Sequence, residues 1–497
     1  MTVAYATGAP SACFSHWNSI DWSVVYQHVH RLQVRIAKAV EKEHWHKVAA
    51  LARILTHSYY AKLWAVRRVV SNKGKNTAGV DRVIWKTPKQ KLNAVKALQQ
   101  RGYRPQPLRR LYIPKSNGKL RPLGIPTMKD RAMQALYALA LTPIAETLAD
   151  ANSYGFREKR SVADAIAQCF ICLAKQASPQ WILEADIKAC FDQIDHDWLL
   201  RHIPMDKRIL QMWLKSGYLE RGTFRQTEKG TPQGGIISPV IANMTLDRLE
   251  MEVKASVAKR GTCVNVIRYA DDFIITGANP EILMKQVKPV VETFLGARGL
   301  TLSEEKTHLR HIEEGFNFLG FNVRKYNQKL LIKPSRTKVN SFMERIRDYI
   351  KSNISVQADR FLRGLNSRLR GIANFYRHVV SKRTFNEIDQ RVYQLLRNWM
   401  HRRHRNKTHA WCKQRYIRRW GTRWQFTVST IKNGKCKPIR LFKVADLPII
   451  RHIKIKGKAH PYNPLHAEYF EQRRYQKWQR RKTDSKFLAS PAIERMV

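Results

Sequence analysis

Residues 266–277 read VIRYADDFIITG, an apolar run that contains two adjacent carboxylates, Asp271 and Asp272. Apolar residues on both sides of the pair predict two buried strands joined by a tight turn. The chain carries 91 Lys and Arg residues against 38 Asp and Glu residues, a formal net charge of +53. In so basic a protein, two acids inside a buried hairpin require a specific cause.

The composition indicates a folded protein with a polyanionic partner. The 497 residues suffice for two to four domains, and a hydrophobic fraction of 43% is typical of globular chains. A net charge this large destabilises a compact state unless a polyanion neutralises it, and nucleic acid is the first candidate. We find no apolar span, lipidation signal or signal peptide, and seven scattered cysteines fit a reducing cytoplasm.

A third acid, Asp186, ends the apolar segment WILEAD, which predicts another buried strand. If the strands are neighbours, Asp186, Asp271 and Asp272 converge, and like charges raise one another's pKa. Bound divalent cations would neutralise this repulsion. Mg²⁺ suits the position, because it prefers carboxylate, phosphate and water oxygens. Two such ions about 3.5–4 Å apart clamp the attacking and leaving oxygens of an in-line phosphoryl transfer. Taken singly, each Asp is also typical of a turn or a helix cap.

Helices and strands follow one another without regular βαβ repeats, so we expect an α+β fold. Apolar residues at helical spacing predict helices in 20–70 and, beyond residue 335, three amphipathic helices in a bundle. A hairpin is predicted around Asn117-Gly118. Residues 401–445 hold fourteen Lys or Arg residues and no Asp or Glu, interleaved with aromatic residues. The basic tail FEQRRYQKWQRRKTDSKF is predicted to end loosely.

Several motifs, in one order along the chain, resemble those of reverse transcriptases. Tyr-Ala-Asp-Asp between apolar runs resembles their catalytic signature, and ADIKACFDQIDH resembles their first catalytic motif. LYIPKSNGKLRPLGIPTMKDRAMQ looks like the fingers motif, GTPQGGIISPVIANMTLD like the loop and helix that contact nucleotide and template, and GLTLSEEKTHL like the block after the Asp pair. HRLQVRIAKAV and GLNSRLRGIANFYRHVVSKRTF are similar to segments of group II intron-encoded maturases, and the match runs from about residue 17 to about residue 475.

The resemblance implies a right-hand polymerase of fingers and palm, followed by a helical thumb and a small basic region. The implied activity is RNA-directed DNA synthesis that copies intron RNA into cDNA during retrohoming, together with binding of the intron RNA to promote splicing. The expected domains are an N-terminal helical extension at 1–70, reverse transcriptase fingers and palm at 71–335, a helical thumb and maturase domain at 336–405, and a basic DNA-binding region at 406–497.

Residue roles follow as implications of the same resemblance. Asp186, Asp271 and Asp272 are the expected catalytic residues and, with Ile187, the expected ligands of two Mg²⁺ ions. Phe191 is expected under the sugar of the incoming nucleotide, where an aromatic ring refuses a 2′-hydroxyl and favours dNTPs, although a core position also explains it. Further expected nucleotide contacts are Lys115, Arg121, Gln233 and Gly234, of which the two cations are also compatible with a solvated hairpin face.

The basic, aromatic segment at residues 401–445 is expected to contact nucleic acid, because Lys and Arg neutralise phosphates and bases stack on aromatic rings. The expected partners are the intron RNA in a ribonucleoprotein, the target DNA, and the RNA template with its DNA primer, without any membrane. The expected location is the bacterial cytoplasm, in association with the nucleoid. The predicted contacts are Arg402, Arg403, Arg415, Arg418, Arg419, Arg423 and Trp420.

One feature departs from the family pattern. Many relatives continue into a zinc-dependent HNH endonuclease, whereas Cys412 and Cys436 stand alone here. The lone CxxC of Cys169 and Cys172 is interpreted as core packing, so no zinc is expected. Bottom-strand cleavage is then not expected of this chain, and the primer would come from a nick made otherwise.

Two alternatives to an intron-encoded polymerase stay open. The first is a domesticated or defence-associated bacterial reverse transcriptase, which the intron-type helices at 360–400 disfavour. The second is an RNA-binding splicing cofactor without polymerase activity, which the presence of all three acids disfavours.

Overall fold

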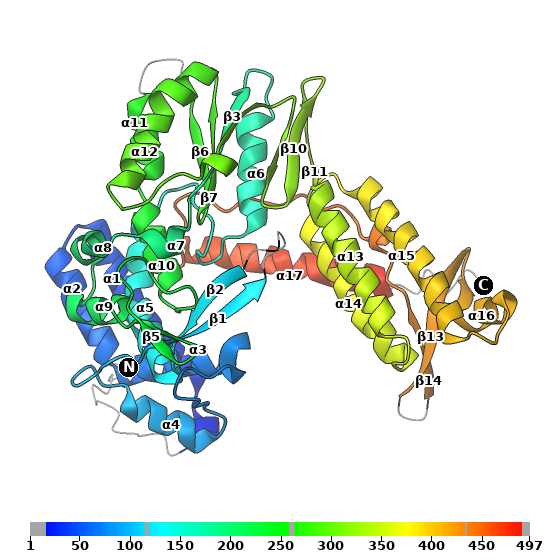
Figure 1. Ribbon diagram of the computed structural model, residues 1–497, viewed down its shortest axis with the longest axis horizontal. Coiled ribbons are helices and arrows are strands. Elements are labelled where there is room, and N and C mark those ends of the chain that lie inside the picture. Colours follow the sequence, from blue (N-terminus) through cyan, green and yellow to red (C-terminus); the bar gives the residue numbers. More distant parts are fainter. Residues whose placement is uncertain (1–15, 115–117, 119, 258–262, 433–434, 490–497) are drawn as a thin grey trace, which may run out of the picture.

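The computed structural model describes residues 16–114, 118, 120–257, 263–432 and 435–489, and its architecture is α+β, as predicted. Figure 1 shows a broad body of helices and sheets on one side and a helical bundle with a small sheet on the other. No helix in the described part of the chain is long and apolar enough to cross a membrane.

Three N-terminal helices pack around one buried helix, α5 (Met128–Leu148). The three are α1 (Trp22–Glu41), α2 (Trp45–His57) and α3 (Tyr59–Ser71). Helix α5 is buried along almost its whole length, as expected for a helix surrounded by others. α4 (Pro88–Ala97) begins at a capping box formed by Thr87 and Gln90.

The first sheet has the strand order β2-β1-β4-β5. Its strands are β1 (Leu108–Pro114), β2 (Leu120–Ile125), β4 (Tyr218–Glu220) and β5 (Thr223–Arg225). β1 and β2 form the predicted hairpin, in which Arg121 pairs with Ile113. The predicted turn residue Asn117 lies outside the described residues.

The second sheet carries the acidic turn and has the antiparallel order β6-β7-β3-β8. Its strands are β3 (Trp181–Asp186), β6 (Asn265–Tyr269), β7 (Asp272–Gly277) and β8 (His308–His311). Successive side chains point to opposite faces. Leu183 and Phe273 join one hydrophobic core with α5 and the N-terminal helices, whereas Ile182 and Ile274 join a second core. Burial of both faces explains why these strands are nearly continuous apolar runs.

Short helices precede or separate the strands of the second sheet along the chain, and among them α6 and α11 contact β6. Side chains of α6 join the second core, whereas those of α11 and α12 join the first. The helices are α6 (Val162–Leu173), α7 (Cys190–Gln193), α8 (His196–His202), α9 (Lys207–Leu214), α10 (Ser238–Leu246), α11 (Leu249–Ser256) and α12 (Lys288–Gly296). The 3₁₀ and π turns are η1 (Trp17–Ser19), η2 (Lys73–Asn76), η3 (Ile282–Val287) and η4 (Glu304–Lys306).

A third sheet and three helices follow the second sheet along the chain. The strands, in the order β11-β10-β9, are β9 (Phe316–Phe318), β10 (Phe321–Tyr326) and β11 (Lys329–Pro334). The helices are α13 (Arg336–Ser352), α14 (Ala358–Tyr376) and α15 (Lys382–Arg403). They form the bundle that the sequence predicted, and their apolar stripes continue the second core.

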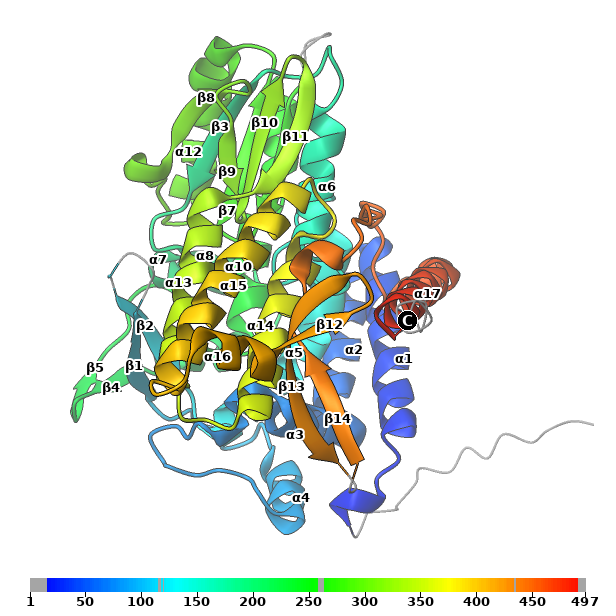
Figure 2. The ribbon, with the colours of Figure 1, turned by 90° about the vertical axis from the view of Figure 1, so that its right-hand side faces the viewer.

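The C-terminal part begins with α16 (His409–Tyr416) and a sheet of β12 (Ile417–Trp420), β13 (Arg423–Lys432) and β14 (Lys435–Arg440). Two turns, η5 (Val444–Asp446) and η6 (Pro464–His466), precede α17 (Ala467–Ala489), which is seen end-on in Figure 2. The prediction of a loose basic tail was wrong, because these residues form α17. Arg473 on this helix donates to Asp164 on α6 and to the carbonyl of Ile453, so polar contacts hold a helix that has no apolar stripe.

Candidate active site and nucleic-acid interface

The register of the second sheet brings the three predicted acids together. Asp186, the last residue of β3, lies opposite Asp272, the first residue of β7, with their Cα atoms about 5 Å apart. The proximity of the Asp186 carboxylate favours the protonated form of Asp272. Asp271 lies in the two-residue turn between β6 and β7, directly after Ala270, whose φ of 59° is left-handed.

The protein leaves the negative charge of these acids poorly compensated. Desolvation in the crowded turn raises the pKa of Asp272 to about 7, and the charges of Asp271 and Asp186 add to the effect. Desolvation and Asp186 also raise the pKa of Asp271, whereas Arg121 and Lys306 act to lower it. Asp272 still reaches solvent, which screens part of the repulsion.

Lys306, which the sequence did not single out, closes one side of the cluster. It is the last residue of η4, and its ammonium donates to Asp186 in an ion pair. This hydrogen bond and the attraction of the three carboxylates raise the pKa of Lys306. The only signal in the sequence was its place in GLTLSEEKTHL, and the fold is needed to bring that segment beside β3.

Ile187 is buried directly behind Asp186 and forms an isolated antiparallel bridge with Leu302. On either side of it, the Ser303 amide donates to the Asp186 carbonyl at 2.8 Å, and the Lys188 amide donates to the Thr301 carbonyl at 3.0 Å. These bonds fix the main chain after β3 against the segment that carries Lys306.

The donors at this site are those of a hard divalent cation, because all of them are carboxylate oxygens. Among the described residues, no three His, Cys, Asp or Glu side chains are already arranged around one metal position. Lys306 supplies the positive charge beside Asp186 instead. Three neighbouring carboxylates, two of them with raised pKa values, nevertheless have the chemistry that fits Mg²⁺.

A buried ion pair holds the strand that leads into the acidic turn. Arg268 on β6 is 2% exposed and donates to Asp247 after α10 and to the side chain of Asn243 on α10. Burial raises the pKa of Asp247 to about 6, although Arg268 opposes that rise. The pair therefore ties β6 to α10. Sequence reasoning missed it, because the two charges are far apart along the chain.

The loop before α6 packs under the turn at contact distance. The Tyr154 amide donates to the Arg268 carbonyl at 2.9 Å, and the Asn243 side chain donates to the Gly155 carbonyl at 2.7 Å. A Cβ atom on Gly155 would lie 2.3 Å from the amide nitrogen of Ala270. Only glycine leaves room for the turn at this position.

Phe191, in α7, is half-buried five residues after Asp186. Its ring meets that of Phe156 edge to face, with centroids 6.2 Å apart. The Thr231 amide donates to the Phe191 carbonyl at 2.6 Å, and a Cβ atom on Gly230 would lie 2.5 Å from that carbonyl oxygen. The loop that precedes the Gln-Gly-Gly sequence is thus docked on Phe191.

The same loop supports the fingers hairpin. The Gly124 amide on β2 donates to the Gln233 carbonyl at 2.7 Å. Gly234 has a φ of 118°, and a Cβ atom there would lie 2.6 Å from the Gly124 carbonyl oxygen. Arg121 lies exposed on the same strand and acts electrostatically on Asp271. Lys115 lies outside the described residues.

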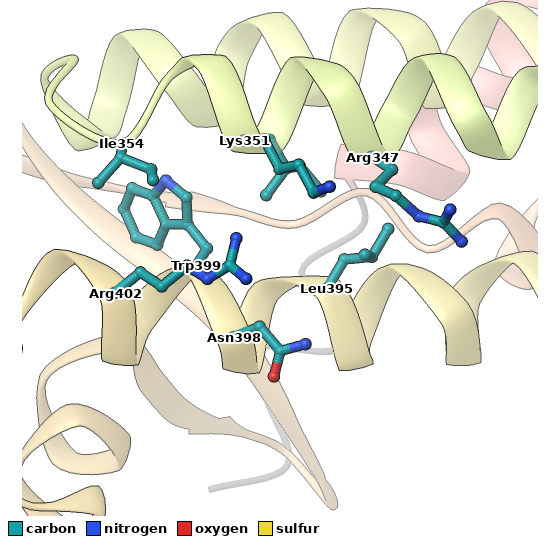
Figure 3. Close-up of a pocket in the computed structure, with 8 residues that line it drawn as sticks. Arg347, Lys351, Ile354, Leu395, Asn398, Trp399 and Arg402 are labelled. Atoms are coloured by element: carbon teal, nitrogen blue, oxygen red, sulfur yellow. The ribbon is translucent and has the colours of Figure 1, made fainter.

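Arg402 lines a pocket of about 300 Å³ between α13 and α15. Figure 3 shows Arg347 and Lys351 on α13 facing Asn398 and Arg402 on α15, with Trp399 between the helices. No Asp or Glu is among the lining residues. A pocket with three cations and an amide attracts an anion such as a phosphate group.

The other predicted nucleic-acid contacts differ in the partners that their side chains have within the protein. Arg403 donates inward to the carbonyls of Ile354 and Val356. Arg423 forms an ion pair with Asp446 at 2.9 Å, whereas the Trp420 indole donates to the Thr427 hydroxyl. Arg415, Arg418, Arg419 and Arg423 are exposed, and the Arg419 guanidinium donates to the Gly421 carbonyl at 3.2 Å.

Three family models match the chain in consecutive order. The N-terminal domain of reverse transcriptase matches residues 17–98, the reverse transcriptase (RNA-dependent DNA polymerase) matches 113–323, and the group II intron maturase-specific domain matches 339–417.

Two bacterial proteins are similar over much of their own length. Protein YkfC of Escherichia coli (strain K12) is 34% identical over 322 residues, which cover 56% of this chain and 83% of YkfC. The group II intron-encoded protein LtrA of Lactococcus lactis subsp. cremoris is 28% identical over 408 residues, which cover 63% of this chain and 68% of LtrA. A solved structure of apo telomerase from Candida tropicalis aligns with 45% of this chain and 54% of that chain, at 15% identity and a TM-score of 0.33, too low to support an argument.

A mixed fold with an acidic hairpin on its central sheet, a fingers hairpin and a following helical bundle defines a right-hand nucleic-acid polymerase. This chain belongs to the group II intron-encoded reverse transcriptases and maturases. It is an RNA-directed DNA polymerase with a maturase domain that acts in splicing, as the sequence predicted. Proteins of this family use divalent metal ions and bind intron RNA and other nucleic-acid substrates.

Proposed function

We propose that Asp186, Asp271 and Asp272 are the catalytic residues of this polymerase and bind two Mg²⁺ ions, with the backbone of Ile187 as a further ligand. The observation that carries this proposal is the strand register, which places Asp186 opposite Asp272. The repulsion between them contributes to the raised pKa of Asp272. Bound Mg²⁺ would supply Lewis-acid activation of the phosphate oxygens. Lys306 would hold Asp186 in place and moderate the repulsion among the acids before substrates bind.

Nucleotide selection is assigned to the surface beside these acids. The Phe191 ring would lie under the sugar of the incoming dNTP and exclude a 2′-hydroxyl. Gln233 and Gly234 would let the main chain approach the template–nucleotide pair, because glycine permits close contact. Arg121, together with Lys115, would bind the triphosphate, since cations there offset the charge that develops in the transition state.

Nucleic acid would be held mainly by the second half of the chain. The thumb and maturase domain at 336–405 would grip the template–primer duplex and the intron RNA, and residues 406–497 would contact the target DNA. Arg402, Arg415, Arg418, Arg419 and the exposed Arg423 would bind phosphates, while Arg403 and Trp420, which donate to other groups of the protein, would shape that surface. We further infer that the protein works as a ribonucleoprotein with its intron RNA, near the nucleoid, during retrohoming.

The catalytic assignment is tested with Asp271→Asn, which removes one charge and preserves side-chain shape. Primer extension on an RNA template with dNTPs and Mg²⁺ should be abolished, while intron RNA binding and splicing stay within about twofold of the parent. The matched control is Asp348→Asn, which changes an exposed acid on α13 and should leave both activities intact. Extension by Asp271→Asn at the parental rate would disprove the assignment.

The DNA-binding assignment is tested by replacing Arg415, Arg418 and Arg419 with Ala. Each lost phosphate contact removes about 0.9 from the slope of log affinity against log salt, so the slope for target DNA should flatten by about 3. The control replaces three exposed lysines of the N-terminal part, Lys86, Lys89 and Lys96. An unchanged slope in the arginine variant would remove these residues from the interface.

A further inference from the structure

An apolar groove separate from the acidic site lies between α6 and β11, with a volume of about 660 Å³. Figures 1 and 2 both show α6 running alongside β10 and β11. The large apolar side chains at the groove that remain exposed are Phe170 (44%), Ile171 (55%), Val380 (54%) and Ile449 (36%). A contiguous patch of this kind on a soluble surface marks a site of interaction.

The strand that borders the groove has a free edge. β11 is the outer strand of its sheet, and among the described residues it forms strand pairs only with β10. On its other side, the Val380 amide donates to the Ile332 carbonyl at 2.9 Å, the one such backbone bond in the described part of the chain. Outward-facing backbone groups recur at every second residue of an antiparallel strand, so the N–H and C=O of Leu330 face the groove. An open edge of this kind is a template for another strand.

The charge of the lining residues indicates which kind of molecule the groove can bind. Lys329, Lys382, Arg451 and Lys454 are among the lining residues, and no Asp or Glu is. A second copy of this chain would bring the same basic residues to a protein that already carries +53. Single-stranded RNA would be attracted by the charge, but most of the lining side chains are apolar, and Lys382 already donates to the carbonyls of Ala445 and Leu447.

We propose that this groove binds an extended acidic segment of a partner protein, which adds a strand to the free edge of β11. Main-chain hydrogen bonds to Leu330 would give affinity, and bulky apolar side chains at alternate positions would pack against Phe170 and Ile171. The intervening acidic side chains would meet Lys329 and Lys454. This site does not depend on the polymerase assignment, because none of its residues belongs to the acidic cluster or the nucleotide surface.

The probe is a fluorescein-labelled peptide of nine residues in which Asp alternates with Phe or Ile, titrated with the full-length chain by fluorescence anisotropy. One comparison peptide carries N-methylated amides along one edge, which prevents strand pairing, and another has Asn in place of Asp. Both should bind at least about tenfold more weakly than the probe. Because only the peptide is changed in these comparisons, misfolding of the protein cannot explain weaker binding.

The protein variant is Ile171→Asp, which puts a charge into the groove at an exposed position and should weaken probe binding at least about tenfold. Ile54→Asp is its control, because Ile54 is 54% exposed on α2 and outside the groove. Primer extension should be unchanged in both variants. Four results would each overturn the proposal: equal binding of the N-methylated peptide, no effect of Ile171→Asp, displacement of the probe by oligo(U) RNA of equal charge, or a dimer in sedimentation that Ile171→Asp dissociates.

Discussion

Replacing Gly155 by Ala should slow DNA synthesis by displacing the acidic turn, although Gly155 has no functional group. A Cβ atom at this position would lie 2.3 Å from the amide nitrogen of Ala270, 2.9 Å from the carbonyl carbon of Tyr269 and 3.0 Å from the Cα of Ala270. All three are backbone atoms, so no rotamer change relieves the clash. Ordinary contact begins near 3.4 Å, and the turn must therefore retreat by about 1 Å. Asp271 follows Ala270 and moves with it.

An error of about 1 Å in the placement of reacting groups costs on the order of 100-fold in rate, or about 2.7 kcal/mol of activation free energy. We therefore expect the single-turnover rate of primer extension at saturating dNTP to fall about 100-fold in Gly155→Ala. Affinity for intron RNA should stay within about twofold, because the basic surfaces lie elsewhere. Gly296→Ala is the matched control, since a Cβ atom there meets nothing within 4 Å.

Extension by Gly155→Ala within about threefold of the parent, at an unchanged melting temperature, would refute this reasoning. It would mean that residues 152–155 move to accommodate the added methyl group, while the turn that carries Asp271 keeps its position. The bonds from Tyr154 to Arg268 and from Asn243 to Gly155 argue against that outcome, because they hold the loop against β6 and α10.

Three further predictions concern charge in the interior. Arg268→Met should lower the free energy of unfolding by about 3–5 kcal/mol in denaturant titrations, because it leaves Asp247 buried without its partner, and adding Asp247→Leu should recover most of the loss. The pKa of Asp272 is about 7 in the folded state against an ordinary 3.8, so the folded protein without metal retains a proton that the unfolded chain releases. Its free energy of unfolding should then fall as pH rises from about 4 to about 7, and added Mg²⁺ should reverse the fall. A free energy of unfolding that does not change with pH in the presence of chelator would contradict the raised pKa of Asp272. Asp164→Asn should destabilise by a similar 3–5 kcal/mol, since it leaves Arg473 unpaired, and an unshifted denaturation midpoint would show that α17 is not anchored there.

The elements that the sequence predicted correctly are those with a local pattern. Residues 266–277 alternate their side chains between two buried faces, so both strands and the turn between them were evident, and Asp186 ends a run of the same kind. The three amphipathic helices after residue 335 were equally clear, because each has an apolar stripe at helical spacing.

The parts that were missed depend on contacts between distant segments. Lys306 looks like any solvated lysine until the bridge of Ile187 with Leu302 brings it beside Asp186. Arg268 lies on β6 and its partner Asp247 directly follows α10, so no local pattern links the two residues. Helix α17 has no apolar stripe, so periodicity gave no reason to predict order in it. In each case long-range ion pairing supplied what local pattern could not.

One of these ion pairs also joins the end of the chain to the polymerase body. The Asp164 carboxylate on α6 accepts from the His452 ring, the Ile455 amide and the Arg473 guanidinium, at 2.8, 2.8 and 3.0 Å. These bonds hold the pKa of Asp164 well below its usual range even though burial works against ionisation. The carboxylate therefore stays charged at any physiological pH and keeps its partners. Because α6 packs on the sheet that carries Asp186 and Asp272, the basic C-terminal segment shares a core with that sheet. Nucleic acid that binds this segment, as proposed above, would thus be held in a fixed relation to the acidic turn, which a flexible tether would not achieve.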